Sequence, residues 1–159
     1  ELLWAAAMLH SCGLHINTSG YHKHSWYLIN NGELLGYSQS EQLVIASLAR
    51  YHRRSLPKKR HESWLLLDRE QRQVVESLSL LLRLAVAMDR RPEAVIDSFQ
   101  LVINDRDINL QLLPLNPTDD LSLELWSLES CAAAFRDGCC YNLCCSLTTT
   151  RVSEQLRAA

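Results

Sequence analysis

The sequence predicts an α+β fold that is mostly α-helical, with a helical part reaching to about residue 91 and a small β-β-α-β unit after it. Two observations support this prediction. Apolar residues recur at helical spacing through the first part, most regularly over residues 68–90. After Pro92 they gather in short, β-like runs such as Phe99–Ile103. We therefore expect two domains, residues 1–91 and residues 92–159.

The helical part contains four segments with helix signals. Ser38-Gln39-Ser40-Glu41 has the form of a capping box, in which the Ser and Glu side chains bind free backbone N–H groups. Asn30-Asn31-Gly32 suits a helix end, and Pro57 and Pro92 stop helices because proline lacks a backbone N–H. The expected helices cover residues 1–11, roughly 21–30, 38 to about 51, and about 68 to 90.

The second part contains signals for strands around one helix. Two β-like runs, residues 99–103 and 108–112, flank Asn104-Asp105-Arg106-Asp107, which suits a hairpin turn. The sequence Asn116-Pro117-Thr118-Asp119-Asp120 can then cap a helix that reaches about Arg136 and ends at Gly138. A last strand is expected from Tyr141 to Thr150, where three threonines favour extended backbone.

The net charge of −2 conceals an asymmetry between the two parts. Residues 1–91 carry 12 Lys or Arg and 8 Asp or Glu, a net charge of +4. Residues 92–159 carry 4 and 10, a net charge of −6. All six histidines lie between His10 and His61. This division predicts that the first part faces an anion and that the second part has another task.

Composition and cysteine spacing indicate a protein of the cytoplasm. No apolar run approaches the ~18 residues of a membrane helix, and the N-terminus lacks the features of a signal peptide. The chain starts at Glu1 inside an apolar segment, so we expect it to be part of a longer polypeptide. The cysteines lack zinc-site spacing, and we interpret them as buried reduced thiols, with a disulfide or a metal site as the alternatives. They are Cys12, Cys131, Cys139, Cys140, Cys144 and Cys145.

Basic and imidazole side chains are concentrated in three short segments, Tyr21–His24, Arg50–Arg54 and Pro57–His61. The first begins a predicted helix, where free N–H groups and the helix dipole already favour anions. The Arg guanidinium supplies a fork of hydrogen-bond donors for phosphate oxygens, and the Lys ammonium supplies a compact positive charge. A solvated charged face is the alternative. The chain has no Gly-x-Ser-x-Gly elbow and no Gly-rich phosphate loop, so its sequence assembles no nucleotide-hydrolysing site.

Two residues are the candidates for a metal site, His10 and Asp89. Metal-dependent HD phosphohydrolases bind a divalent ion with a His, a His-Asp doublet and a later Asp on helices. His10 could be the histidine of the doublet, but Ser11 follows it. Because a hydroxyl brings no charge to balance the ion, we expect no metal site in this chain.

An ordered set of motifs resembles the C-terminal region of the exopolyphosphatase / guanosine pentaphosphate phosphatase family over about residues 2–91. The matching segments are Leu9–Gly13, Ser19–Ser25, Leu35–Ser38, Ala49–Arg54, Leu82–Ala85 and Asp89. The resemblance implies a helical domain with an HD-like bundle. Members often have His-Asp or His-Glu at the doublet, and Ser11 departs from both. Residues 92–159 resemble the small terminal α/β unit of the family only in texture and position.

The resemblance also implies a role for the chain. The parent would be a hydrolase acting on phosphoanhydride bonds, with Mg²⁺ and a catalytic carboxylate in an N-terminal actin-like region that this chain lacks. The chain itself would need no cofactor, bind polyphosphate, contribute to a homodimer and act with that catalytic region. The residues expected to contact phosphate are His22, Lys23, His24, Arg50, Arg53, Arg54, Lys58, Lys59 and Arg60.

Two other functions remain open at this point. A residual HD-type phosphohydrolase would use His10, His22 or His24, and Asp89 around a metal. A nucleic-acid-binding module would use the basic residues with Tyr21 and Tyr51, although the acidic second part opposes it. The choice between polyphosphate and guanosine pentaphosphate as substrate of the parent is also open.

Overall fold

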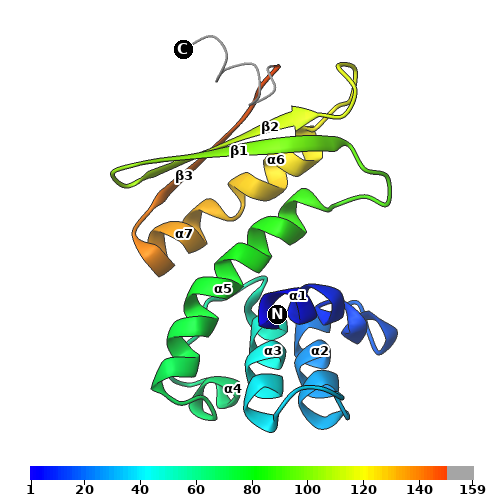
Figure 1. The fold of residues 1–159 in the computed structure, drawn as a ribbon, viewed down its shortest axis with the longest axis vertical. Coiled ribbons are helices and arrows are strands. Elements are labelled where there is room, and N and C mark those ends of the chain that lie inside the picture. Colours follow the sequence, from blue (N-terminus) through cyan, green and yellow to red (C-terminus); the bar gives the residue numbers. More distant parts are fainter. Residues whose placement is uncertain (150–159) are drawn as a thin grey trace. The chain divides into compact units, whose positions relative to one another are not determined.

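The computed structural model describes residues 1–149, and within it the chain forms two compact units (Figure 1). The first is Glu1–Arg83 and the second starts at Leu84, inside the longest helix. The mostly helical α+β fold predicted from the sequence is confirmed. None of the helices within residues 1–149 combines the length and the apolar character needed to cross a membrane.

The first unit is helical throughout. Each of the four helices expected here is present, although the first ends at Leu9 and is followed by a separate 3₁₀ turn, and a short helix at residues 62–65 was not predicted. The elements are α1 (Leu2–Leu9), η1 (Cys12–His15), α2 (Tyr21–Asn31), α3 (Gln39–Tyr51), α4 (Glu62–Leu65) and α5 (Arg69–Met88), the last of which continues into the second unit.

Helix α3 forms the centre of the first unit. It begins with the predicted capping box, in which Ser38 Oγ accepts from the backbone N–H of Glu41 and the Glu41 carboxylate accepts from that of Ser38. From Val44 to Ala49 every side chain is buried, and α1 and α2 pack against the helix. Because α3 is buried and α2 packs against it, the end of α3 and the start of α2 are held in place relative to each other.

A close contact at Gly13 holds η1 against the start of α2. The backbone N–H of Gly13 donates to Ser25 Oγ at 3.0 Å, and this hydroxyl donates to the carbonyl oxygen of His10 at 2.7 Å. A Cβ atom at position 13 would collide with the carbonyl oxygen of Tyr21 and the amide nitrogen of Ser25. Only glycine fits here, and the contact fixes the first turn of α2.

The second unit contains a three-stranded sheet with two helices along one face (Figure 1). The strand order is β1-β2-β3; β1 pairs with β2 in antiparallel fashion and β2 with β3 in parallel. One face of β2 is buried through Ile108, Leu110 and Leu112, and both helices contact β3. The elements are β1 (Ile96–Asn104), β2 (Asp107–Pro114), α6 (Ser122–Glu129), α7 (Ala132–Cys139) and β3 (Asn142–Leu147).

The structure corrects two expectations in the second unit. The helix expected to reach about Arg136 is two helices, and at the break Ser130 Oγ and Cys131 Sγ donate to carbonyl oxygens four residues earlier. Cys140 and Cys144 are exposed rather than buried, although all six thiols are free. The last strand ends at Leu147, and Thr150 lies outside the described residues.

Candidate functional site

The fold of the first unit brings the basic segments together. The Arg53 guanidinium, just after α3, lies over the ring of Tyr21 at the start of α2, 4.7 Å from its centroid. The pKa of His22 is lowered to about 4, first by burial and then by the surrounding cations, including Arg50 and Lys23. Residues distant in sequence thus form one region of positive potential, which we call the basic cluster: Lys23, Arg50, Arg53, Arg54, Lys58, Lys59 and Arg60.

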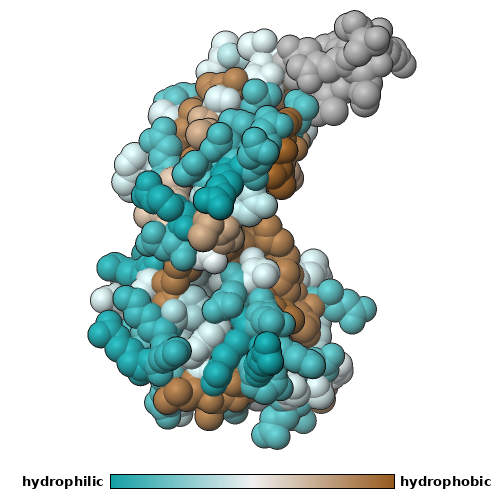
Figure 2. Space-filling view, turned by 90° about the vertical axis from the view of Figure 1, so that its left-hand side faces the viewer, coloured by the Kyte–Doolittle hydropathy of each residue, from teal (hydrophilic) through white to brown (hydrophobic). Residues whose placement is uncertain are grey.

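Within the described residues, the charges of the basic cluster have no carboxylate partners. Among residues 1–149, no Asp or Glu oxygen lies within ion-pair distance of any of its cations, and the Arg91–Glu124 pair lies in the second unit. Arg54, Lys58, Lys59 and Arg60 are exposed, and Lys23 is exposed on α2. Hydrophilic residues also cover much of the face of this unit in Figure 2. The positive charge is therefore available to an anion from solution.

Two buried histidines and the half-buried Tyr21 form a layer beneath these cations. His22 is 4% exposed and His52 is 1% exposed. His52 Nδ1 donates to the carbonyl oxygen of Ala49 at 2.7 Å, which leaves Nε2 to accept from the Tyr21 hydroxyl at 3.1 Å. Burial lowers the pKa of His52 to about 3 against the opposing effect of that backbone bond. Both imidazoles are therefore neutral at pH 7 and support the cluster from within.

A small pocket opens between the first half of α2, the end of α3 and the start of α4. Its volume is about 270 Å³, and Lys23, Trp26, Arg50, His61, Glu62 and Ser63 line it. The Tyr51 hydroxyl lies 3.2 Å from His61 Nδ1 and 2.9 Å from Ser63 Oγ, and so positions both side chains. This pocket contains two of the sequence-predicted phosphate contacts, Lys23 and Arg50.

The other predicted contacts lie elsewhere. Arg53 stacks on Tyr21, and the segment from Arg54 to Arg60 is mostly exposed. His24 is half-buried with its Cβ beside Gly13. Sequence reasoning missed Trp26, His61 and Ser63 as pocket residues. His61 ends the run Pro57-Lys58-Lys59-Arg60-His61 and could have been found there, whereas nothing local distinguishes Trp26 or Ser63.

Arg83 anchors the end of α3, where the basic cluster begins. Its guanidinium donates to the carbonyl oxygen of Tyr51 at 2.9 Å and to that of Arg54 at 3.0 Å, and only 8% of the residue is exposed. Arg54 itself has φ +62°, a left-handed conformation that favours glycine. An arginine is therefore held where the backbone alone would select a smaller residue.

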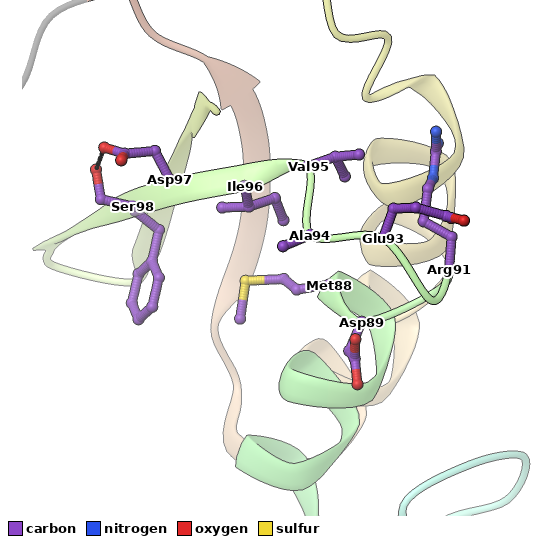
Figure 3. A pocket seen from close by; sticks show the side chains of 10 residues that line it. Met88, Asp89, Arg91, Glu93, Ala94, Val95, Ile96, Asp97 and Ser98 are labelled. Atoms are coloured by element: carbon purple, nitrogen blue, oxygen red, sulfur yellow. Dashed lines mark hydrogen bonds between the residues drawn. The ribbon is translucent and has the colours of Figure 1, made fainter. Parts of the chain in front are cut away.

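The second unit has a larger hollow beside the start of β1 (Figure 3). Its volume is about 550 Å³; Met88 and Ile96 lie close together within it, and Asp89 lies at the end of α5. The guanidinium of Arg91 makes a two-pronged ion pair at 2.8 and 2.9 Å with Glu124, which is fully buried. This ion pair neutralises the charge of Arg91, so Arg91 gives the hollow no free positive charge that could bind an anion.

The metal-ligand candidates from the sequence are not part of a cluster of ligands. His10 Nδ1 donates to the carbonyl oxygen of Ala7 at 2.6 Å, and Asp89 is exposed at the end of α5. Within the described part of the chain, no three His, Cys, Asp or Glu side chains are grouped so that they could hold a metal ion.

A family model described as Ppx/GppA phosphatase, domain III, matches residues 1–131. The chain belongs to the Ppx/GppA phosphatase family. The resemblance found in the sequence is thereby confirmed, and the match continues beyond residue 91 through β1, β2 and α6 of this domain III chain.

Three relatives of this Ppx/GppA chain carry the name guanosine-5'-triphosphate,3'-diphosphate pyrophosphatase. The protein of Pseudoalteromonas translucida is 39% identical over 111 residues, which cover 69% of this chain and 22% of the relative. That of Pseudoalteromonas atlantica is 33% identical over 110 residues, or 69% and 21%. That of Vibrio atlanticus is 32% identical over 134 residues, or 79% and 25%. The chain thus spans about a fifth to a quarter of the length of these relatives.

Proposed function

We propose that this chain binds polyphosphate for a Ppx/GppA phosphatase whose catalytic region, an actin-like N-terminal part outside this chain, hydrolyses the terminal phosphoanhydride bond. The observation that carries the proposal is the basic cluster, in which three segments place unpaired cations around the ends of α2 and α3. A linear polyanion with one charge per phosphate can contact such a set of cations simultaneously. The chain would hold the substrate, and another region would cleave it.

Three further features belong to this proposal. The chain contributes to a homodimer, the parent enzyme uses Mg²⁺ in its catalytic region, and the protein acts in the cytoplasm. Each is carried over from the family resemblance or the sequence. The membership of the chain in a phosphatase family supports these three features in general terms.

Guanosine pentaphosphate is the second candidate substrate of the parent. It is favoured by the names of the three relatives, which refer to a guanosine nucleotide carrying phosphates on both its 5' and 3' positions. The basic cluster suits both candidates, because each presents several linked phosphate groups. Comparison of long-chain polyphosphate with guanosine pentaphosphate at equal phosphate concentration would rank the two.

The structure gives less support to the residual HD-type phosphohydrolase. His10 uses one ring nitrogen within α1, and the described residues offer it no pair of further ligands. Elemental analysis of the purified protein tests this alternative directly. Stoichiometric manganese, iron or magnesium that is lost on substitution of His10 would establish it.

Binding of long-chain polyphosphate at increasing salt concentration tests the main proposal. If about seven phosphates are contacted, affinity should fall about a thousand-fold between 50 and 200 mM salt, as counterion release from a single-stranded polyanion requires. The double variant Arg50→Ala/Arg53→Ala should bind more weakly, and the slope of log K against log salt should decrease by about 1.4.

A matched control removes the same charge from the second unit. Arg106 and Arg136 are exposed there, so Arg106→Ala/Arg136→Ala changes the net charge equally without touching the basic cluster. We expect this variant to bind like the unaltered chain. Equal weakening in both double variants would show that net charge alone governs binding and would refute the assigned surface.

A further inference from the structure

The pocket between α2 and α3 differs from the rest of the basic surface because it is an open recess lined largely by hydrogen-bond donors. Lys23 contributes an ammonium group, Arg50 a guanidinium group and His61 an imidazole. Ser63 adds a hydroxyl, and Glu62, which is exposed, is the one acidic residue in the lining. Such a set of donors matches the acceptor oxygens of a tetrahedral anion.

Arg50 is the pocket residue whose positive charge a bound anion would stabilise most. It is half-buried, and within residues 1–149 its guanidinium makes no hydrogen bond or ion pair, only a contact 5.6 Å from the centroid of the neighbouring Tyr51 ring. Burial lowers the pKa of Arg50, which reflects the cost of holding its charge away from water. A bound anion would offset that cost, since a buried charge is stabilised by an opposite one.

The neutral groups of the pocket are fixed before any ligand arrives. The Tyr51 hydroxyl contacts both His61 and Ser63, and the Tyr51 and His61 rings stack at 5.7 Å with an interplanar angle of 19°. Tyr51 is fully buried, so this support is rigid. Trp26 forms an apolar wall, and its buried indole N–H has no hydrogen-bond partner among residues 1–149. Groups held in place in this way lose little conformational entropy on binding.

The size of the pocket limits what it can hold. Sites for drug-sized ligands enclose about 300 to 1,000 Å³, and this pocket encloses about 270 Å³. A single phosphoryl group fits such a volume, whereas a complete guanosine nucleotide with several phosphates belongs to the larger class.

We propose that Lys23, Arg50, His61 and Ser63 form a discrete pocket for one tetrahedral phosphoryl group, which is the end group of a polyphosphate chain or free orthophosphate. The end-group source rests on the proposed function, whereas the orthophosphate source stands without it. Long chains would then bind in two parts, with interior phosphates on the open basic cluster and one group in the pocket.

The indole N–H of Trp26 provides a direct test by nuclear magnetic resonance of the full 159-residue chain. The four tryptophans give four indole signals, and Trp26→Phe assigns the one that matters. Addition of orthophosphate should shift the Trp26 signal saturably at millimolar concentration, while those of the exposed Trp4 and Trp126 stay in place. Tripolyphosphate and long-chain polyphosphate form the other two arms. A shift with these but not with orthophosphate would identify the chain end as the source.

Two variants connect the signal to the pocket. Arg50→Met should abolish the shift, with Arg136→Met, far along the sequence in the second unit, as the charge-matched control. Glu62→Gln removes the acidic residue of the lining at an exposed position and should tighten orthophosphate binding several-fold. This second variant keeps the test decisive if Arg50→Met fails to fold.

The outcomes separate this proposal from the proposed function. An unmoved Trp26 signal with all three phosphate ligands at about 10 mM, or equal shifts of all four tryptophans, would overturn the pocket and leave salt-dependent polyphosphate binding intact. If orthophosphate bound in the pocket but long chains did not bind, the pocket would be supported and the proposed function refuted.

Discussion

Burial decides what each histidine near the basic cluster can do. His22 and His52 are almost completely buried, and their pKa values are lowered to about 4 and about 3. An imidazole in water can change its charge near neutral pH, but these two are uncharged there. His61 differs because it lines the pocket, and its pKa is lowered by burial and then by Arg50 and other cations. A bound anion would counteract that repulsion.

The buried histidines predict acid sensitivity of the fold. In the unfolded chain a histidine has a pKa near 6.5, so below that pH the unfolded state binds protons that the folded state excludes. The contribution of these two histidines to the free energy of unfolding is therefore fully present above pH 6.5. It is lost as the pH falls toward their folded pKa values of about 4 and about 3. Each histidine contributes a slope of about 1.4 kcal/mol per pH unit within its window.

The variant His52→Asn isolates one of these contributions. The amide nitrogen of asparagine can replace Nδ1 as donor to the Ala49 carbonyl oxygen but does not titrate. The free energy of unfolding is measured with urea at several pH values. Between pH 6 and 5, its slope against pH should be smaller in the variant by about 1.4 kcal/mol per pH unit. Between pH 7.5 and 8, the variant and the unaltered chain should have the same slope against pH. An unchanged slope between pH 6 and 5 would contradict the burial of a neutral imidazole.

His61 predicts a different pH dependence, that of anion binding. Lys23, Arg50, Lys58 and Arg60 oppose protonation of His61, and a bound anion would raise its pKa again. Affinity should therefore increase as the pH falls below about 6.5, by at most about tenfold per pH unit. Sulfate is the suitable probe because, unlike phosphate, it does not itself titrate in this range.

The comparison is between the unaltered chain and His61→Gln. The variant should bind sulfate with the same affinity at pH 7 and at pH 5.5, since glutamine carries no titrating group. If both proteins gained affinity equally as the pH fell, the pH effect would not come from His61.

At the scale of elements, the end of α3 combines an anchor with a strained residue. Arg83 binds the carbonyl oxygens of Tyr51 and Arg54, and Arg54 has φ +62°. A left-handed conformation costs a non-glycine residue about 1–2 kcal/mol, and glycine loses part of this advantage through its freer unfolded chain. Arginine at this position therefore adds a cation to the basic cluster at a cost in backbone strain.

Two substitutions at position 54 separate backbone strain from charge. Arg54→Gly should be more stable than Arg54→Ala by about 1 kcal/mol, because only glycine avoids the strain. Both should weaken polyphosphate binding to the same degree, because both remove the same cation. Thermal or urea unfolding gives the first comparison and a salt-dependent binding assay the second. Unequal binding would show that Arg54 acts through the backbone conformation.

The elements that the sequence predicts well are those with local signals. The capping box at Ser38 and Glu41 determines where α3 begins, and every side chain of α3 from Val44 to Ala49 is buried. The break between α6 and α7 was missed because Ser130 and Cys131 are compatible with a helix interior until their side chains bind its carbonyl oxygens. The parallel pairing of β2 with β3 was also missed, since no local pattern specifies it.

The candidate site shows the same limit. A run of basic residues is visible in the sequence, so the cluster of cations could be predicted. Its pocket could not, because it depends on how Tyr51 at the end of α3 contacts His61 and Ser63 on the next segment. The sequence likewise does not show that His22 lies beneath the cluster rather than on it, since its neighbour Lys23 is exposed.

For the whole molecule, the distribution of charge and of aromatic faces predicts which polyanion the chain would prefer. Proteins that bind single-stranded nucleic acid combine basic residues with aromatic rings on which bases stack. Here the two tyrosines among the basic segments are not available for stacking. Tyr51 is fully buried, and Arg53 covers the ring of Tyr21 at 4.7 Å. Residues 92–159 also carry a net charge of −6, which opposes the binding of a polyanion there.

Competition between long-chain polyphosphate and single-stranded RNA tests this preference. At equal phosphate concentration and fixed salt, polyphosphate should displace a labelled RNA, and RNA should need at least about tenfold more phosphate to displace polyphosphate. The physical reason is that stacking, which contributes about 1–3 kcal/mol per base in RNA-binding proteins, is lost here. RNA then keeps only its phosphate contacts, and sugars space its phosphates more widely than the directly joined phosphates of polyphosphate. Arg53→Ala uncovers Tyr21 and should narrow the difference by weakening polyphosphate more than RNA. RNA binding as strong as polyphosphate binding in the unaltered chain would favour a nucleic-acid-binding module instead.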